Sequence, residues 1–221
     1  MKNKKIQKLF FEDYFSTVKI LLDKIDYEKL IKISDFVEKS IKSKKKIFVA
    51  GNGGSASVAN HFLCDFNKGI KLSSKYKMIP KVYSLANSIE LITAISNDIK
   101  YENIFDFQLE NYANKGDVVF AFSCSGNSKN ILNLINKANL MNLDVIFITG
   151  FLKKKLKNRV KFHYDLSCQN YGITEDMFSS FMHLISQWIR FKYSNYKKKS
   201  EFIVLILFNK NFMCFNFFLF F

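Results

Sequence analysis

Two sets of residues in this sequence have types and spacings that suit metal binding. His61 and Asp65 stand four positions apart, and Glu175 and His183 stand eight positions apart further along the chain. Positions four apart share one face of an α-helix, so each set offers an imidazole and a carboxylate on one side of a helix. These groups bind zinc and similar divalent ions. A His–Asp pair at this spacing also forms surface hydrogen bonds, so the spacing alone leaves both interpretations open.

Two short segments combine glycine and serine in a way that suits an anion. The first is "GNGGSAS" at residues 51–57, which contains three of the eight glycines in the chain, and the second is "SCSGNS" at residues 123–128. A helical pattern follows each segment, and a helix N-terminus offers free N–H groups and a positive dipole end to a phosphate. Neither segment has the pattern of a nucleotide-binding motif. Taken alone, each could instead cap a helix and turn the chain.

The periodicity of apolar residues predicts the elements that position these segments. Continuous apolar runs predict buried parallel strands at 46–51, 81–86, 117–123, 144–150 and 161–166. Helical patterns cover 4–46, 55–68, 88–97, 102–113, 128–141 and about 174–196. This alternation predicts an α/β fold in which helices cover both faces of a five-stranded parallel sheet. Because ligands bind beyond the carboxyl ends of such strands, both segments should face one site.

Composition narrows the class of protein. The 221 residues suit one domain, and the hydrophobic content of 48% suits a globular core. The formal charge of +15 comes from lysines scattered along the chain rather than gathered in a stripe, so we expect no nucleic-acid partner. Four widely spaced cysteines predict a reduced, cytoplasmic protein. Glu12 and Asp13 interrupt the apolar N-terminal stretch, so no secretion signal is expected.

The C-terminal stretch differs from the rest of the chain. Residues 202–221 are almost wholly apolar, interrupted by a lysine and three asparagines. Such a stretch could contact a membrane, pack in a core or interface, or fray outside the working fold, although charged and amide side chains are costly inside a bilayer. We therefore predict one domain over residues 1–200 and an apolar tail of unassigned role over 201–221.

The segments "GNGGSASVANHF" and "SCSGNSKN" together resemble the SIS (sugar isomerase) domain, and within it the phosphoheptose isomerases, over about residues 6–193. The resemblance implies a SIS-type three-layer sandwich with an N-terminal helical pair, assembled as a homotetramer with active sites between subunits. It also implies isomerisation of sedoheptulose 7-phosphate to D-glycero-D-manno-heptose 7-phosphate through an enediol. That product supplies heptose for surface polysaccharide, either lipopolysaccharide or capsule.

The resemblance also implies roles for individual residues. Substrate-binding positions would be Asn52, Gly53, Gly54, Ser55, Asn97, Asp98, Ser123, Cys124, Ser125, Ser128 and Glu175. Among these, the residues from Ser123 to Ser128 would hold the phosphate. Zinc, or another divalent metal, would bind His61, Asp65, Glu175 and His183, with one ion in each subunit. Asp65 would be the catalytic base and His183 the acid.

Three positions depart from the pattern of the family. Family members commonly have threonine where Cys124 stands, which matters little if the backbone N–H binds the phosphate. They typically have glutamate at the position of Asp65 and glutamine at the position of Glu175, and both replacements keep an oxygen ligand. Aspartate is one methylene shorter, so its carboxylate would fall about 1 Å short, and a misplacement of that size costs about a hundredfold in rate.

Two other functions fit the same sequence. The first is an isomerase that acts on a different sugar phosphate. The second is a non-catalytic SIS module that binds a phosphosugar or a protein. The retention of both histidines and both carboxylates favours an enzyme, whereas the shortened side chain at Asp65 favours the binding module. The third histidine, His163, lies on a predicted strand between two aromatic residues and is interpreted as structural.

Overall fold

The computed structural model describes residues 2–152 and 160–194. Within these residues, five parallel strands form one sheet in the order β2-β1-β3-β4-β5. They are β1 (Lys46–Ala50), β2 (Lys81–Ser84), β3 (Val118–Ser123), β4 (Asp144–Thr149) and β5 (Phe162–Asp165). The predicted α/β class and parallel sheet are confirmed. The predicted domain end at residue 200 and the apolar tail lie outside the described residues.

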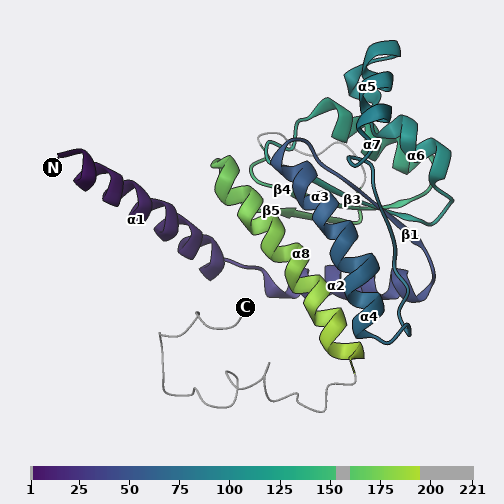
Figure 1. The fold of residues 1–221 in the computed structure, drawn as a ribbon, viewed down its shortest axis with the longest axis horizontal. Coiled ribbons are helices and arrows are strands. Elements are labelled where there is room, and N and C mark those ends of the chain that lie inside the picture. Colours follow the sequence, from purple (N-terminus) through teal and green to yellow (C-terminus); the bar gives the residue numbers. More distant parts are fainter. Residues whose placement is uncertain (1, 153–159, 195–221) are drawn as a thin grey trace.

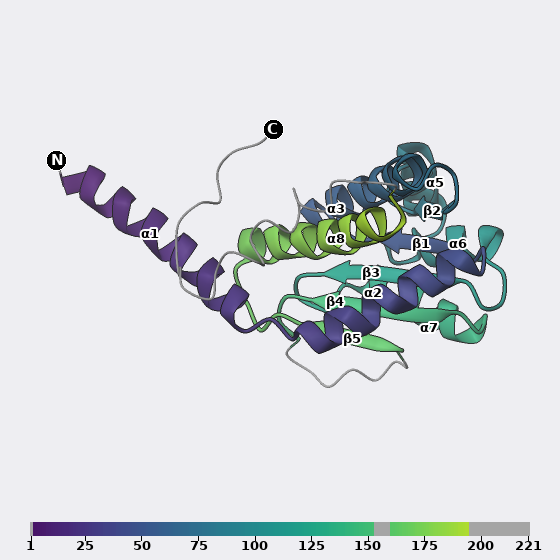
Figure 2. The ribbon, with the colours of Figure 1, turned by 90° about the horizontal axis from the view of Figure 1, so that it is seen from below.

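Helices cover both faces of the sheet and make a three-layer sandwich (Figures 1 and 2). One face packs against α2 (Tyr27–Lys42), α3 (Gly54–Cys64) and α8 (Tyr171–Tyr193). The other face packs against α5 (Ile89–Asp98), α6 (Asp106–Tyr112) and α7 (Lys129–Leu140). Alternate side chains of each central strand enter the two cores, as Val119 and Phe120 of β3 do. Both strand faces are therefore apolar, which explains the continuous apolar runs in the sequence.

Polar capping residues determine where two of the predicted helices begin. The helical pattern over 4–46 divides into α1 (Lys2–Asp23) and α2, because the Asp26 carboxylate accepts a hydrogen bond from the backbone N–H of Lys29 and caps α2. The last helix begins before the predicted residue 174, because Asn170 caps it by accepting from the N–H of Ile173. The predicted N-terminal helical pair is therefore present.

A π-helical turn interrupts the helix predicted over 55–68. The α-helical hydrogen bonding of α3 ends at Cys64, and η1 (Asp65–Ile70) continues as a π-helical turn into the short α4 (Lys71–Ser73). The remaining short element is the 3₁₀ turn η2 (Tyr101–Asn103) before α6. A π-helical turn holds one residue more than an α-helical turn and is frequent at functional sites. Asp65 is its first residue.

Helix α1 projects away from the rest of the molecule (Figures 1 and 2). Only its C-terminal half packs against the core, where the Tyr14 hydroxyl donates a hydrogen bond of 2.5 Å to Asp176 of α8. Several large apolar side chains of α1 are exposed, and those of Phe10 and Phe15 are more than 60% exposed. No helix among residues 2–152 and 160–194 has an apolar stretch long enough to cross a membrane.

Candidate active site

The two glycine- and serine-containing segments meet at one edge of the sheet, as the sequence predicts. They follow β1 and β3, which are neighbouring parallel strands, so both segments leave the sheet at its carboxyl edge. Gly53 has a φ of +54°, which favours glycine, and it places the chain at the start of α3. Asn52 and Asn130 exchange two side-chain hydrogen bonds of 2.9 Å, which tie the first segment to α7.

A cavity of about 340 Å³ lies between these segments. Its lining residues are Asn52, Gly53, Gly54, Ser55, Phe122, Ser123, Cys124, Ser125, Ser128, Tyr171 and Glu175. Nine of the substrate-binding positions that the sequence indicated are among them. Asn97 and Asp98 are not: they are exposed at the end of α5, where the Asn97 amide donates to the Asp98 carboxylate at 2.8 Å.

Sequence reasoning missed two lining residues, Phe122 and Tyr171. Phe122 is the residue before the serine segment, and its place in an apolar run marked it only as a strand residue. Tyr171 is the first residue of α8, directly after the Asn170 cap. Asn170 could have indicated Tyr171, because an asparagine N-cap at this position predicts a helix that begins at Tyr171 rather than at residue 174.

The serine segment presents neutral hydrogen-bond donors to the cavity. The Ser123 hydroxyl lies 3.4 Å from that of Ser128, and it accepts a 3.1 Å hydrogen bond from the N–H of Gly126. Ser128 is the N-cap position of α7, yet its side chain makes no capping bond with that helix. Its hydroxyl and the first N–H groups of α7 can therefore serve an anion. Among the residues that the structure describes, no lysine or arginine lines this cavity.

Cys124 and Glu175 also line the cavity. Burial raises the pKa of the Cys124 thiol to about 11, although a hydrogen bond with Ser55 opposes the shift, and the Glu175 carboxylate adds to it. The thiol is therefore neutral at neutral pH. A Glu175 carboxylate oxygen lies 3.4 Å from the Ser55 hydroxyl and 3.7 Å from the Cys124 sulfur. A Cβ atom on residue 54 would collide with that carboxylate, so Gly54 leaves the space that Glu175 occupies.

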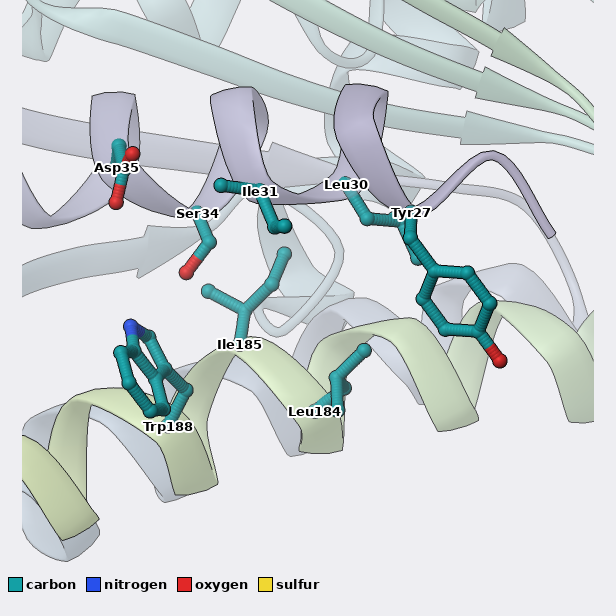
Figure 3. A pocket seen from close by; sticks show the side chains of 8 residues that line it. All are labelled: Tyr27, Leu30, Ile31, Ser34, Asp35, Leu184, Ile185 and Trp188. Atoms are coloured by element: carbon teal, nitrogen blue, oxygen red, sulfur yellow. The ribbon is translucent and has the colours of Figure 1, made fainter.

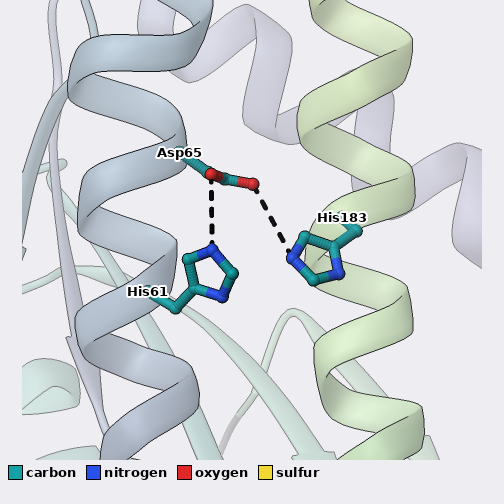
Figure 4. A group of neighbouring side chains, drawn as sticks. All are labelled: His61, Asp65 and His183. Atoms are coloured by element: carbon teal, nitrogen blue, oxygen red, sulfur yellow. Dashed lines mark ion pairs between the residues drawn. The ribbon is translucent and has the colours of Figure 1, made fainter. Parts of the chain in front are cut away.

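His61, Asp65 and His183 form a separate cluster between α3 and α8 (Figure 4). The Asp65 carboxylate lies 3.5 Å from Nε2 of His61 and 3.9 Å from Nε2 of His183. One ligand atom from each residue lies within 4.8 Å of the others, which suits a divalent ion. Burial lowers the pKa of His183, with a smaller opposing effect from Asp65 and a further lowering by His61. A neutral imidazole is the form that binds metal.

The structure does not bring Glu175 to this cluster. Glu175 and His183 stand eight residues apart on α8, which corresponds to a rise of about 12 Å along the helix axis. The spacing that placed them on one side of a helix also places them two turns apart. The cluster within one chain therefore holds three of the four metal ligands that the sequence indicated, and the carboxylate of Glu175 lines the cavity instead.

Comparison with known proteins assigns this arrangement to a family. The family model described as SIS domain matches residues 13–150, so the chain belongs to this family. It is 32% identical over 169 residues to the "Probable phosphoheptose isomerase" of Thermoplasma acidophilum, covering 76% of this chain and 91% of the relative. It is also 32% identical over 166 residues to the phosphoheptose isomerase of Aliarcobacter butzleri, covering 73% and 84%. These relatives place the chain among the phosphoheptose isomerases, and it is an isomerase.

The fold agrees with a solved structure of that group. The structure of a phosphoheptose isomerase from Neisseria gonorrhoeae matches with a TM-score of 0.72 and 22% sequence identity, covering 86% of this chain and 98% of that one. At this identity the match shows the fold, and it confirms the SIS-type three-layer sandwich that the sequence predicted.

Proposed function

We propose that the protein converts sedoheptulose 7-phosphate to D-glycero-D-manno-heptose 7-phosphate in the cytoplasm, supplying heptose for surface polysaccharide. The single observation that carries this proposal is that α3 and α8 both line the cavity with its neutral phosphate donors. The same two helices, with the first residue of η1, also bring two imidazoles and a carboxylate together. The donors suit the phosphate, and the cluster suits proton transfer beside a carbonyl group.

Each part of the site has a role in the isomerisation. Ser123, Ser125 and Ser128 hold the phosphate, and the segment from Asn52 to Ser55 lies along the sugar chain. Asp65 removes the proton from the carbon next to the carbonyl and returns it to the neighbouring carbon of the enediol. His183 donates a proton to the carbonyl oxygen. The developing negative charge on that oxygen has to be stabilised within the site.

A divalent metal such as zinc fits the three-residue cluster. His61, Asp65 and His183 would hold it, because two imidazole nitrogens and a carboxylate oxygen are typical zinc ligands and lie close together. When bound, the metal would polarise the carbonyl oxygen of the substrate as a Lewis acid. Glu175 would join such a centre only from a second copy of the chain, since its own α8 holds it about 12 Å from His183.

The spacing of the two parts supports an active site shared between subunits. Ser55 in the cavity and Asp65 in the cluster stand ten positions apart along α3 and the start of η1, a rise of about 15 Å. A sugar held in the cavity of one chain would then meet the proton-transfer residues of another. We propose a homotetramer on this ground.

An apolar groove between α2 and α8 offers a surface for that assembly (Figure 3). It encloses about 370 Å³, and its lining residues are Tyr27, Leu30, Ile31, Ser34, Asp35, Leu184, Ile185 and Trp188. Helix α1 carries exposed apolar side chains of its own. It projects away from the rest of its own chain, to which the hydrogen bond from Tyr14 to Asp176 attaches it (Figures 1 and 2). We propose that α1 of a second copy fills the groove, because burying both apolar surfaces is favourable.

The test of this function is direct turnover. Purified protein is incubated with sedoheptulose 7-phosphate, and the product is followed by NMR, with and without added zinc. Accumulation of the heptose 7-phosphate is the expected result. Turnover of a different sugar phosphate, with none of sedoheptulose 7-phosphate, would reassign the substrate.

A further inference from the structure

Asp165 is the last residue of β5 and is not among the described residues that line the cavity. We propose that Asp165 is a positioning residue that holds the serine segment, residues 123–128, in its phosphate-binding conformation. This proposal rests on the proposed function only in naming phosphate as the ligand of that segment. It assigns a role to a carboxylate that contacts neither the phosphate nor the reacting atoms.

The Asp165 carboxylate joins the ends of two strands and the chain that follows each of them. Oδ1 accepts a 2.5 Å hydrogen bond from the hydroxyl of Thr149, its register partner on β4, and a 3.0 Å bond from the N–H of Leu152. Oδ2 accepts from both the N–H and the hydroxyl of Ser167, at 3.2 and 3.1 Å. Four bonds to one ionised group make a strong local anchor, because hydrogen bonds to a charged acceptor are stronger than neutral ones.

The segment that Asp165 holds is itself bonded to the serine segment. The N–H groups of Gly150 and Phe151 donate to the carbonyl oxygen of Cys124, at 3.0 and 2.8 Å. The Leu152 side chain lies against Gly126, where a Cβ atom would come within 2.5 Å of Leu152 Cδ1. Residues 150–152 therefore hold the serine segment in place through hydrogen bonds to its backbone and through van der Waals contact with Gly126.

Thr149 connects His163 to the same network. The Thr149 side chain is fully buried, and its oxygen lies 2.9 Å from Nε2 of His163. Because the hydroxyl hydrogen is donated to Asp165, the Thr149 oxygen accepts from His163, which therefore carries its hydrogen on Nε2. The histidine that the sequence marked as structural thus holds Thr149 in the orientation that Asp165 needs.

Loss of the carboxylate should affect ligand binding and not the chemical step. Without Asp165, the N–H of Leu152 and the hydroxyl of Thr149 lose their acceptor, so residues 150–152 no longer hold the serine segment in one conformation. The phosphate donors would then have to be ordered when the ligand binds, which weakens binding. The proton-transfer residues lie on α3, η1 and α8, and they keep their geometry.

The chain offers a matched control at the opposite end of the same two strands. Asp144 begins β4, is also partly buried, and pairs with Lys161 at 2.8 Å and Lys45 at 3.5 Å. Asp165→Ala should raise the KM for sedoheptulose 7-phosphate about tenfold or more, the effect of one or two lost hydrogen bonds, while kcat stays within about threefold. Asp144→Ala should leave both constants close to those of the wild type.

Hydrogen exchange tests the same proposal without any ligand. Backbone amides of residues 124–127 should exchange faster in Asp165→Ala than in the wild type, and Asp144→Ala should show no such change. If the alanine variant fails to fold, Asp165→Asn, which keeps one acceptor oxygen, carries the comparison with a smaller expected effect. Unchanged exchange in the serine segment, an equal change in the Asp144 variant, or a fall in kcat at constant KM would overturn the proposal. Failure of the wild type to turn over the sugar phosphate would count against the proposed function alone, because the exchange comparison still decides the role of Asp165.

Discussion

Asp65 is the residue on which the enzymatic proposal depends most. Its carboxylate lies between His61 and His183, so it is placed both to move a proton and to bind a metal. It is also shorter than the glutamate typical of the family. The two roles respond differently to substitution, and this difference makes them separable by experiment.

Asp65→Asn should lower kcat by about a hundredfold to ten-thousandfold if Asp65 is the general base, because the amide cannot accept the proton. Asp65→Glu should keep or raise the activity, since it restores the reach of the family. The measurement is kcat of the wild type and both variants, with and without added zinc. Rescue of Asp65→Asn by excess zinc would instead assign Asp65 to metal binding alone. Activity in Asp65→Glu but not in the wild type would favour the non-catalytic module.

The serine segment gives a second prediction at the scale of the residue. Replacing Ser125 or Ser128 with leucine should raise the KM for the sugar phosphate strongly, because the side chain would fill the space in front of the α7 N-terminus. Thermal unfolding should change little, since both residues line an open cavity. Steady-state kinetics with a parallel melting curve is the measurement. An unchanged KM in both variants would mean that the phosphate binds elsewhere.

At the scale of the elements, the end of α8 is attached to α2 through Glu38. This glutamate is 5% exposed and accepts hydrogen bonds from Lys192 at 2.9 and 3.1 Å and from the Tyr193 hydroxyl, while Lys42 pairs with it at 3.0 Å. Burial alone would raise the pKa of the Glu38 carboxyl, but the bonds from Tyr193, Lys192 and Lys42 outweigh it and lower the pKa to about 2. The folded state therefore favours the ionised carboxylate.

The stability that Glu38 contributes should depend on pH in a defined direction. Because its folded pKa lies below the ordinary value of 4.5, the contribution is complete above pH 4.5 and is lost as the pH falls toward 2. Glu38→Gln should therefore lower the melting temperature at pH 7 by more than it does near pH 2. Thermal unfolding of both proteins across this range is the measurement. The exposed, ion-paired Glu110 supplies the control, since Glu110→Gln should have a small effect at every pH. A constant difference between wild type and Glu38→Gln would contradict the prediction.

The elements also show which features could be predicted from the sequence. The sheet, the two segments at its edge and the shared face of His61 and Asp65 follow from short-range patterns, and all three are present. The hydrogen bond from Thr149 to Asp165 could not be predicted, because it depends on which strands become neighbours and in what register. The eight-residue spacing places Glu175 and His183 on one side of a helix. It also separates them by about two turns along the helix axis, and the sequence interpretation did not include this rise. No local pattern indicated that Asn97 and Asp98 would be exposed at the end of α5.

At the scale of the whole molecule, the apolar surface of α1 and the groove between α2 and α8 are exposed within residues 2–152 and 160–194. Trp188 in the groove is 46% exposed and Phe10 of α1 is 65% exposed. Both are large apolar side chains of the kind that becomes buried at subunit interfaces.

Replacing either side chain with a charged residue should therefore weaken the assembly. Trp188→Glu and Phe10→Glu should each shift the proposed tetramer toward smaller species at micromolar concentration, because a charge at the centre of an apolar interface is costly. Light scattering coupled to size exclusion is the measurement. Leu140→Glu serves as the control, since Leu140 is 78% exposed at the end of α7 on the opposite face of the sheet. A wild-type monomer with full activity would contradict both the assembly and the shared site.

The π-helical turn at Asp65–Ile70 has a consequence for how this chain tolerates changes in length. Such a turn stores one surplus residue within an otherwise regular helix. Deleting the exposed Lys68 should therefore let α3 run on as an unbroken α-helix without loss of the fold. The residues on either side of the deletion should keep their present faces toward α8, because a π-helical turn and an α-helical turn both advance the chain by about one full revolution. A one-residue alignment gap at this turn would accordingly be compatible with the same proton-transfer geometry, provided that the side chains named above are retained.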